Sequence, residues 1–421
     1  MRTKPKIAII GAGLSGLATA YELTKDEKYA VTVFEAREEV GGRVKSILVN
    51  DHPVDVGGFI IYPWYDNYHR IMRELDLVKK LVCIKNVEIY YQLEPNGKFY
   101  SQKKIPVSMT AKVAFATRVV PGWLRNRPDF RTPDIQNFGS KTIAEFLPKK
   151  NGAMTNLAKF IDCVNQGYCY PALDQFQMSF YAPFIYQTLV HGDLRTGCYF
   201  GGNNQLFTNT VASAIKARGG KIHCNATVTA VHDKKITVQG KMQKFDAIVW
   251  ANSVSALYKN CIEAPPFSYT HFYAAVVRVS DFPPINGKNN WTAIFTAPCY
   301  PEQNQITSLF RAENMASKLE SEYLIINYKT VTDKSFSNSK LSLELNKNLK
   351  ILFPQIEKIK LVAAIQWKQT MPIATTDFVA EARAKQGNDG HYFAGDYLGA
   401  PSMETALSSG VAVADLIMQD I

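Results

Sequence analysis

The stretch KIAIIGAGLSGLATAYELTKDEKYAVTVFE, residues 6–35, decides the fold of this 421-residue chain. It opens with a short apolar run that predicts a strand buried on both faces. The pattern G-x-G-x-x-G follows at Gly11, Gly13 and Gly16, where a helical pattern starts. A second apolar strand then ends in Glu35, 19 residues after Gly16. This order of strand, glycines, helix, strand and acid is typical of a dinucleotide-binding βαβ unit.

Each glycine of the pattern has a physical role. Gly11 permits a tight turn between strand and helix, and Gly13 lets the backbone approach a pyrophosphate without a Cβ in the way. Gly16 lets the helix lie close to the sheet. The pyrophosphate would then meet backbone N–H groups at the positive end of the helix, around Leu14 and Ser15.

The acid and the loop that follows it point to a more specific cofactor. Glu35 would accept hydrogen bonds from the adenosine ribose hydroxyls, and its charge would repel a 2′-phosphate, which disfavours NADP. After Glu35 and Ala36 comes an E-E-V-G-G-R run that ends in Gly42 and Arg43. An acid followed closely by V-G-G-R resembles the flavin amine oxidase superfamily, which includes protoporphyrinogen oxidases and carotenoid desaturases. The resemblance implies FAD, with Arg43 near its pyrophosphate.

Three later blocks resemble the same superfamily: D-V-G-G at residues 55–58, residues 201–251, and H-Y-F-A-G-D with the helix after it at 391–410. The resemblance implies that a valine pairs with the adenine edge, that an aspartate accepts from ribityl or phosphate-side hydroxyls, and that the last helix points its positive end at the flavin. It adds these residues to the predicted cofactor site: Gly57, Gly58, Val228, Gly395, Asp396, Met403, Glu404, Thr405 and Ala406.

The order of these blocks predicts an α/β protein with two interleaved domains. A chain of 421 residues exceeds the usual size of a single hydrophobic core. We expect a discontinuous Rossmann-like FAD-binding domain at residues 1–78, 200–264 and 362–421. An α+β substrate domain would comprise residues 79–199 and 265–361.

The resemblance also implies the type of reaction. We expect a hydride to pass from a C–H or C–N bond of a small, apolar organic substrate to FAD. Residues 396–406 contain no cysteine, so the FAD should be noncovalent, and residues 271–280 contain no lysine, which weakens a true amine oxidase interpretation. His191 is the only candidate for a pocket acid or base, although a lone histidine is more often structural. No metal-binding pattern is present.

Two alternatives of other classes stay open. A flavin-dependent isomerase resembling UDP-galactopyranose mutase would need arginines for a substrate diphosphate, and Arg195, Arg278 and Arg311 could supply them. A binding protein resembling a Rab GDP-dissociation inhibitor would share the architecture without the flavin, but the intact Gly42-Arg43 and Gly395-Asp396 elements disfavour it.

The cysteines and the hydropathy suggest a compartment. Seven scattered cysteines without a C-x-x-C pair are interpreted as reduced structural thiols. No apolar run approaches the roughly 20 residues that span a bilayer. The first strand starts at about residue 6, which leaves no room for a signal peptide. We therefore expect a cytoplasmic protein.

Residues 98–131 hold most of the formal net charge of +11, with eight basic residues and a single acid. Residues 103–120 predict a helix with an apolar stripe, ended by Pro121-Gly122 and followed by Trp123. One interpretation is a solvated helix face. The other is peripheral contact with a membrane surface, which the stripe and Trp123 favour. Nucleic acid is disfavoured because no nucleic-acid-binding motif accompanies the charge.

Overall fold

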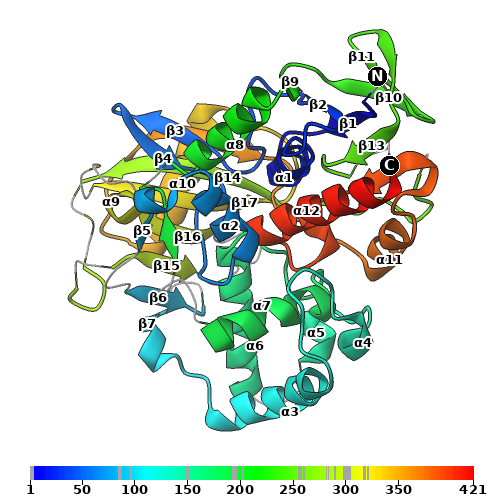
Figure 1. Ribbon diagram of the computed structural model, residues 1–421. Coiled ribbons are helices and arrows are strands. Elements are labelled where there is room, and N and C mark those ends of the chain that lie inside the picture. The colour runs from blue at the N-terminus through cyan, green and yellow to red at the C-terminus, as the bar shows by residue number, and fades with distance from the viewer. Residues whose placement is uncertain are drawn as a thin grey trace.

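The computed structural model contains two large β-sheets, of five and seven strands, with helices packed around them (Figure 1). The description covers residues 4–83, 88–94, 97–147, 152–191, 197–201, 203–254, 258, 261–280, 282, 284–288, 291–296, 305–315, 319 and 322–421.

The first sheet is parallel and is built around the predicted first strand. Its strand order is β19 (His391–Phe393), β13 (Ala247–Trp250), β1 (Lys6–Ile10), β2 (Ala30–Phe34) and β9 (Lys221–His223). The apolar residues of β1 are buried because neighbouring strands and helices cover the strand on all sides. This is the Rossmann-like arrangement expected from the glycine pattern.

Helix α1 (Leu14–Leu23) packs against α12 (Met403–Asp420) and α8 (Gln205–Ala217). Figure 1 shows α1 and α12 side by side, although they come from opposite ends of the chain. Gly410 makes the close approach possible, since a Cβ there would meet the Ser15 carbonyl oxygen. The Thr19 hydroxyl donates a hydrogen bond to the Gly410 carbonyl at 2.9 Å.

The second sheet is mostly antiparallel. Its order is β18 (Ile359–Trp367), β14 (His271–Val279), β17 (Tyr323–Thr330), β16 (Ile306–Arg311), β15 (Ala293–Thr296), β6 (Ile89–Gln92) and β7 (Phe99–Ser101). Helix α10 (Asn338–Leu352) covers part of one face. Strand β18 lies in this sheet, although the predicted boundary assigned residues from 362 onward to the first domain. The domain boundaries stay a prediction.

The remaining strands form three smaller sheets. The short strands are β3 (Ser46–Val49), β4 (His52–Asp55), β5 (Val82–Cys83), β8 (Cys198–Tyr199), β10 (Val228–His232), β11 (Lys235–Val238) and β12 (Lys241–Lys244). The other helices are α2 (Asp66–Glu74), α3 (Met109–Arg125), α4 (Ile135–Phe138), α5 (Ile143–Phe146), α6 (Gly152–Gly167), α7 (Met178–His191), α9 (Ala312–Met315) and α11 (Thr376–Ala384). Helices α3 to α7 gather below the sheets in Figure 1, with α3 at the lower edge.

Helix α3 differs from the prediction at both ends. It begins at Met109, where the Ser108 hydroxyl caps it by accepting from the Ala111 N–H at 3.2 Å. Pro121 was wrongly taken as its end, because the helix continues through it to Arg125. The Asn126 N–H still bonds to the Gly122 carbonyl at 3.0 Å, and the helix stops there because Asn126 is extended. A proline thus removes one hydrogen bond from this helix without ending it.

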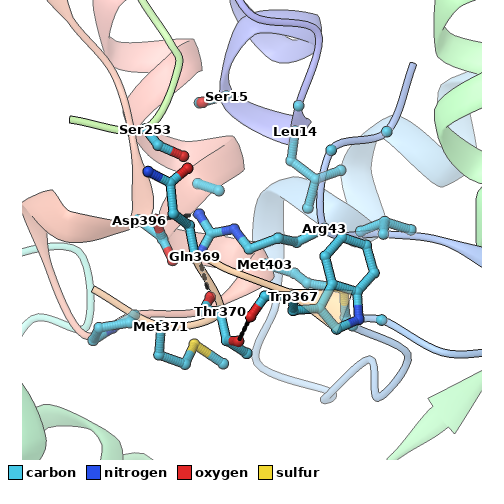
Figure 2. A pocket seen from close by; sticks show the side chains of 18 of the residues that line it. Leu14, Ser15, Arg43, Ser253, Trp367, Gln369, Thr370, Met371, Asp396 and Met403 are labelled. Atoms are coloured by element: carbon cyan, nitrogen blue, oxygen red, sulfur yellow. Dashed lines mark hydrogen bonds and ion pairs between the residues drawn. The ribbon is translucent and has the colours of Figure 1, made fainter. Parts of the chain in front are cut away.

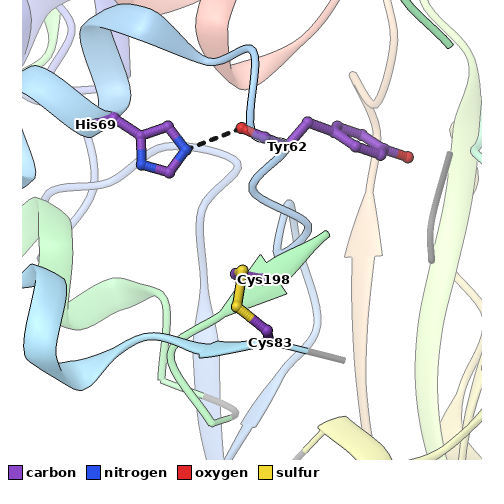
Figure 3. The surroundings of a disulfide bond; sticks show 4 residues. All are labelled: Tyr62, His69, Cys83 and Cys198. Carbon is purple, nitrogen blue, oxygen red and sulfur yellow. Dashed lines mark hydrogen bonds between the residues drawn. A yellow bond between two sulfur atoms is a disulfide. The ribbon is translucent and has the colours of Figure 1, made fainter. Parts of the chain in front are cut away.

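The expectation that all cysteines are reduced thiols is wrong for one pair. Cys83 and Cys198 are joined by a disulfide, shown in Figure 3. The two cysteines are 115 residues apart and lie opposite each other where β5 pairs with β8. Cys198 also exchanges both backbone hydrogen bonds with Ile61, so the bond adjoins the loop before Tyr62. The pairing removes the cysteine argument for a reducing compartment, and the localisation stays a prediction.

Candidate functional site

A cavity of about 530 Å³ lies between the two sheets. Loops that leave the carboxyl ends of β1, β2, β13 and β19 line one end of it, which is the usual ligand site of an open α/β sheet. All but three of the predicted cofactor residues line this cavity. The exceptions are Gly16, Glu404 and Thr405.

The glycine turn has room for a ligand at one position only. A Cβ built on Gly13 would have no atom within 4 Å, although its φ of −73° suits any residue. Gly11 has a φ of 107° and lies against the Ala251 carbonyl, so the turn itself requires it. A Cβ on Gly16 would meet the Gly11 carbonyl oxygen. Gly11 and Gly16 therefore serve the fold, and Gly13 leaves an open space that a close-lying ligand can use.

Glu35 follows β2 and is held in place by backbone donors. Its carboxylate accepts from the Ala12 N–H at 2.7 Å and from the Arg37 N–H at 2.9 Å. The residue is 8% exposed and lines the cavity. Each carboxylate oxygen accepts one of these bonds and keeps capacity for another, as ribose hydroxyls would require.

Arg43 and Asp396 form the central ion pair of the site (Figure 2). The guanidinium donates two bonds to the carboxylate, at 2.8 and 2.7 Å, and a third to the Thr370 carbonyl at 2.7 Å. Burial lowers the pKa of Arg43, but the adjacent Asp396 carboxylate raises it further, so it stays above its ordinary value. The pair joins the loop after β2 to the loop after β19 and holds the Arg43 guanidinium beside the cavity.

Asp55 is a third carboxyl at the cavity, and it is 1% exposed. Its Oδ1 accepts from the Ser46 hydroxyl at 2.6 Å and from the Asn204 N–H at 2.9 Å. Oδ2 has no hydrogen-bond partner within the described part of the chain. Burial raises the pKa of Asp55 to about 7, with the two donors acting in the opposite direction.

The start of α12 meets the second glycine turn. Ser402 caps this helix by accepting from the Thr405 N–H at 2.9 Å, and Met403 packs over Gly58. The positive end of the α12 dipole therefore adjoins the cavity. The next two side chains point elsewhere, since Glu404 accepts from the Asn67 and Tyr68 N–H groups of α2, and the Thr405 hydroxyl donates to the Ala400 carbonyl.

Two segments of the site contribute residues that the sequence analysis did not name. The end of β18 and the loop after it bring Trp367, Gln369, Thr370 and Met371 to the cavity wall (Figure 2). Residues after β13 bring Asn252 and Ser253. The Trp367 indole N–H donates to the Val56 carbonyl at 2.7 Å, next to the second glycine turn. In the sequence, the change from the apolar strand that ends at Trp367 to the polar pair Gln369-Thr370 could have indicated that this loop lines a site.

The far end of the cavity is aromatic and is called the aromatic end below. The second sheet, the loop after β4, the turn after α6 and helix α7 line it with Phe59, Ile60, Tyr62, Tyr65, Tyr168, Cys169, Tyr170, Phe184, Phe272, Ala274, Phe310, Ile325 and Asn327. Burial raises the pKa values of Tyr65 and Tyr170 well above the ordinary value for tyrosine, so both phenols are neutral. The Tyr170 hydroxyl donates to the Pro401 carbonyl at 2.5 Å.

Several predicted residues do not meet at this cavity. His191 is exposed at the end of α7 and is absent from the cavity lining. Arg278 pairs with Glu322 at 2.6 Å, and Arg311 pairs with Glu313 at 2.9 Å. Neither arginine lines the cavity, and Arg195 lies outside the described residues. The alternative of a diphosphate-binding isomerase loses its expected ligands there.

The described residues contain neither a cluster of metal ligands nor a helix that could span a membrane. No three histidine, cysteine, aspartate or glutamate side chains within them gather as metal ligands. None of the helices in the described ranges has the length and apolar character of a membrane span.

The chain is similar to known flavoproteins. The family model for flavin containing amine oxidoreductases matches residues 14–288. Prenylcysteine oxidase 1 of Rattus norvegicus is 42% identical over 74 residues, 17% of this chain and 14% of that protein. Zeta-carotene desaturase of Capsicum annuum is 36% identical over 192 residues, 38% of this chain and 32% of that protein. The matches thus span less than a third of the length of these two relatives.

The fold extends over the whole chain in solved structures. A putative protoporphyrinogen oxidase from Exiguobacterium sp. 255-15 superposes with a TM-score of 0.75 at 14% identity, covering 100% of both chains. At this identity the likeness concerns the fold alone. It agrees with a Rossmann-like FAD-binding domain joined to a second, sheet-based domain.

Proposed function

This chain belongs to the family of flavin-containing amine oxidoreductases, and from that premise we propose that it oxidises an uncharged, apolar organic substrate by removing hydride from a C–H bond, at a carbon bonded to carbon or to nitrogen. The family supplies the class of the protein and its FAD cofactor. The nature of the substrate is inferred from the aromatic end of the cavity.

The observation that carries the proposal is the distribution of charge along the cavity. Among the described lining residues, the acidic and basic side chains are Glu35, Arg37, Arg43, Asp55 and Asp396. All five belong to the segments that carry the predicted cofactor site. The aromatic end offers neutral phenols, phenyl rings and the amide of Asn327. A charged substrate there would lose its hydration without an opposite charge to replace it, which costs several kcal/mol.

The residues at the other end of the cavity fit FAD. Gly13 leaves open space beside the start of α1, Glu35 suits the adenosine ribose, and Arg43 provides positive charge near a pyrophosphate. Bound FAD supplies a hydride acceptor, and the protein supplies binding, orientation and electrostatics. The N-terminus of α12 would favour negative charge that develops on the cofactor.

The chain's own groups would then position the substrate and exclude water. Rings from β14, β16, α7 and the loop after β4 form an apolar wall that leaves little for water to bond to. Asn327 could orient one polar group of the substrate, since it is the only amide at the aromatic end in the described lining. No protein base is assigned, because removal of hydride from an activated carbon does not require one.

The names of the two relatives, a carotene desaturase and a prenylcysteine oxidase, support a substrate with an apolar chain. Such a substrate could come from a membrane. The proposal therefore includes peripheral membrane contact by an otherwise cytoplasmic enzyme, with residues 98–131 as the contact.

Anaerobic reduction of the bound flavin tests the proposal. FAD-loaded protein is mixed with pairs of compounds that share one unsaturated hydrocarbon chain. One member of each pair ends in a neutral group, and the other ends in a primary amine or in a carboxylate. We expect the neutral member of each pair to bleach the flavin absorbance fastest. Faster bleaching by the amines or the carboxylates would contradict the proposed substrate class.

A further inference from the structure

Helix α3 exposes an apolar stripe on the side that faces away from the protein. A surface helix normally turns its polar face to water and its apolar face to the core. In α3 the inner side is buried through Ala111 and Val119. The outer side carries, at spacings of 4, 7 and 4 residues, Met109 (71% exposed), Val113 (53%), Val120 (37%) and Leu124 (82%). Water is therefore an unfavourable neighbour for this face.

The end of α7, which contacts α3, also exposes apolar side chains. Leu189 is 71% exposed and Val190 is 54% exposed. Tyr186, one turn earlier on α7, packs its ring against Trp123 of α3 with centroids 5.5 Å apart. The C-terminal halves of the two helices therefore touch. Trp123, predicted to face a membrane, instead packs inward, so the exposed apolar residues are others.

Cations flank this stripe. Five basic side chains are exposed and form no ion pair within the described part of the chain: Lys103, Lys104, Lys112, Arg125 and Arg127. Two other basic side chains of residues 98–131 have partners within the protein. Arg118 donates to the Phe146 carbonyl at 2.8 Å, and Arg131 pairs with Asp129 at 3.0 Å. The positive charge is thus available to an external partner.

We propose that the α3–α7 surface docks on the face of an anionic lipid bilayer. We define this surface as Met109, Val113, Val120, Leu124, Leu189 and Val190 with the flanking Lys103, Lys104, Lys112, Arg125 and Arg127. The apolar side chains enter the boundary between headgroups and acyl chains, and the cations bind lipid phosphates and carboxylates. The inference deepens the proposed function, because an apolar substrate would be taken from the same bilayer.

Other partners fit this surface less well. A second copy of the chain, paired by a two-fold axis, would place the same cations against one another. Nucleic acid would use the cations but would leave the apolar stripe in water. An anionic bilayer accommodates both features together.

Flotation with vesicles tests the proposal on the FAD-loaded protein. The vesicles contain phosphatidylcholine alone or mixed with phosphatidylserine, at low and at high salt. A charge variant replaces four cations, Lys103→Gln, Lys104→Gln, Lys112→Gln and Arg125→Gln. An apolar variant carries Val113→Gln, Leu124→Gln and Leu189→Gln.

Helix α10 offers a matched control. It exposes Leu343 (67%) with Lys347 and Lys350 on a helix that lies far from α3 in Figure 1. The control variant carries Leu343→Gln, Lys347→Gln and Lys350→Gln. FAD content and thermal unfolding of every variant establish that it is folded.

We expect the wild type and the control to float with the phosphatidylserine vesicles at low salt and to be released at high salt. Each cation near an anionic surface contributes about a fivefold change in partition, so the charge variant should lose more than tenfold. The apolar variant should float more weakly than the wild type at low salt, although its cations are intact. A wild type that ignores anionic vesicles, or variants that float as well as it does, would overturn the proposal.

Two further outcomes would also overturn it. One is an equal loss of flotation in the control variant. The other is a wild-type dimer that the apolar variant converts to a monomer, because a second copy would then cover the surface. Flotation does not depend on turnover. If the protein fails to float with vesicles, the flavin can still be reduced by a soluble substrate, and if the proposed substrate class is wrong, the protein can still float.

Discussion

Gly13→Ala separates the role of the cofactor from that of the fold. The backbone at Gly13 is extended, with φ −73° and ψ −177°, and the new methyl group would meet no atom within 4 Å. Alanine is a poorer helix cap than glycine, which lowers the free energy of unfolding by up to about 1 kcal/mol. Alanine also restricts the unfolded chain more than glycine does, which raises the free energy of unfolding by about 0.4–1 kcal/mol. The free energy of unfolding of the FAD-free protein should therefore change by less than about 1 kcal/mol. The methyl group fills the space that a pyrophosphate would approach, so FAD should bind at least tenfold more weakly, about 1.4 kcal/mol.

Gly16→Ala is the matched contrast. Its Cβ would meet the Gly11 carbonyl oxygen and lie 3.2 Å from the Ala251 Cβ, so the helix must shift, at a cost of about 1–3 kcal/mol. Thermal unfolding of both FAD-free variants, and fluorescence titration with FAD, supply the two measurements. Wild-type FAD affinity in Gly13→Ala would refute the reasoning. So would a loss of stability in Gly13→Ala as large as that in Gly16→Ala.

Three further changes probe other parts of the account. Glu35→Ala should weaken FAD binding by about 1–3 kcal/mol in the same titration, because it removes a charged acceptor, and unchanged affinity would place the ribose elsewhere. Since burial raises the pKa of Asp55 to about 7, its proton stabilises the FAD-free fold below about pH 4, and roughly 4 kcal/mol is lost as pH rises through 7. Urea unfolding at about pH 5 and pH 8 measures this decline in the free energy of unfolding, which should be smaller in Asp55→Asn than in the wild type. An equal decline in both proteins would count against the raised pKa of the buried carboxyl. Cys83→Ser should cost about 2–5 kcal/mol and abolish any effect of dithiothreitol on the melting temperature, whereas a wild type insensitive to dithiothreitol would argue against the disulfide.

The local parts of this fold could be predicted because short segments encode them. The apolar run of β1, the glycines and Glu35 lie within 30 residues, and their spacing sets the turn and the edge of the sheet. The ends of α3 were harder to predict. Pro121 was taken as a stop, yet the packing of Trp123 on α7 keeps the helix going for another turn.

The long-range parts of the site could not be read from spacing. Arg43 and Asp396 are each recognisable alone, but their direct ion pair joins positions 353 residues apart. The disulfide depends on the alignment of two two-residue strands, and the contribution of Trp367 depends on where β18 ends in the second sheet. Tertiary packing decides each of these contacts, and a pattern along the chain does not record it.

The most direct test of the central claim is the amount of FAD released from the purified protein by acid precipitation. The account predicts a yellow protein that leaves about one FAD per chain in the supernatant and a colourless pellet. Flavin that remains in the pellet would contradict noncovalent binding. A colourless protein that takes up no added FAD would contradict the claim that this cavity is a flavin site.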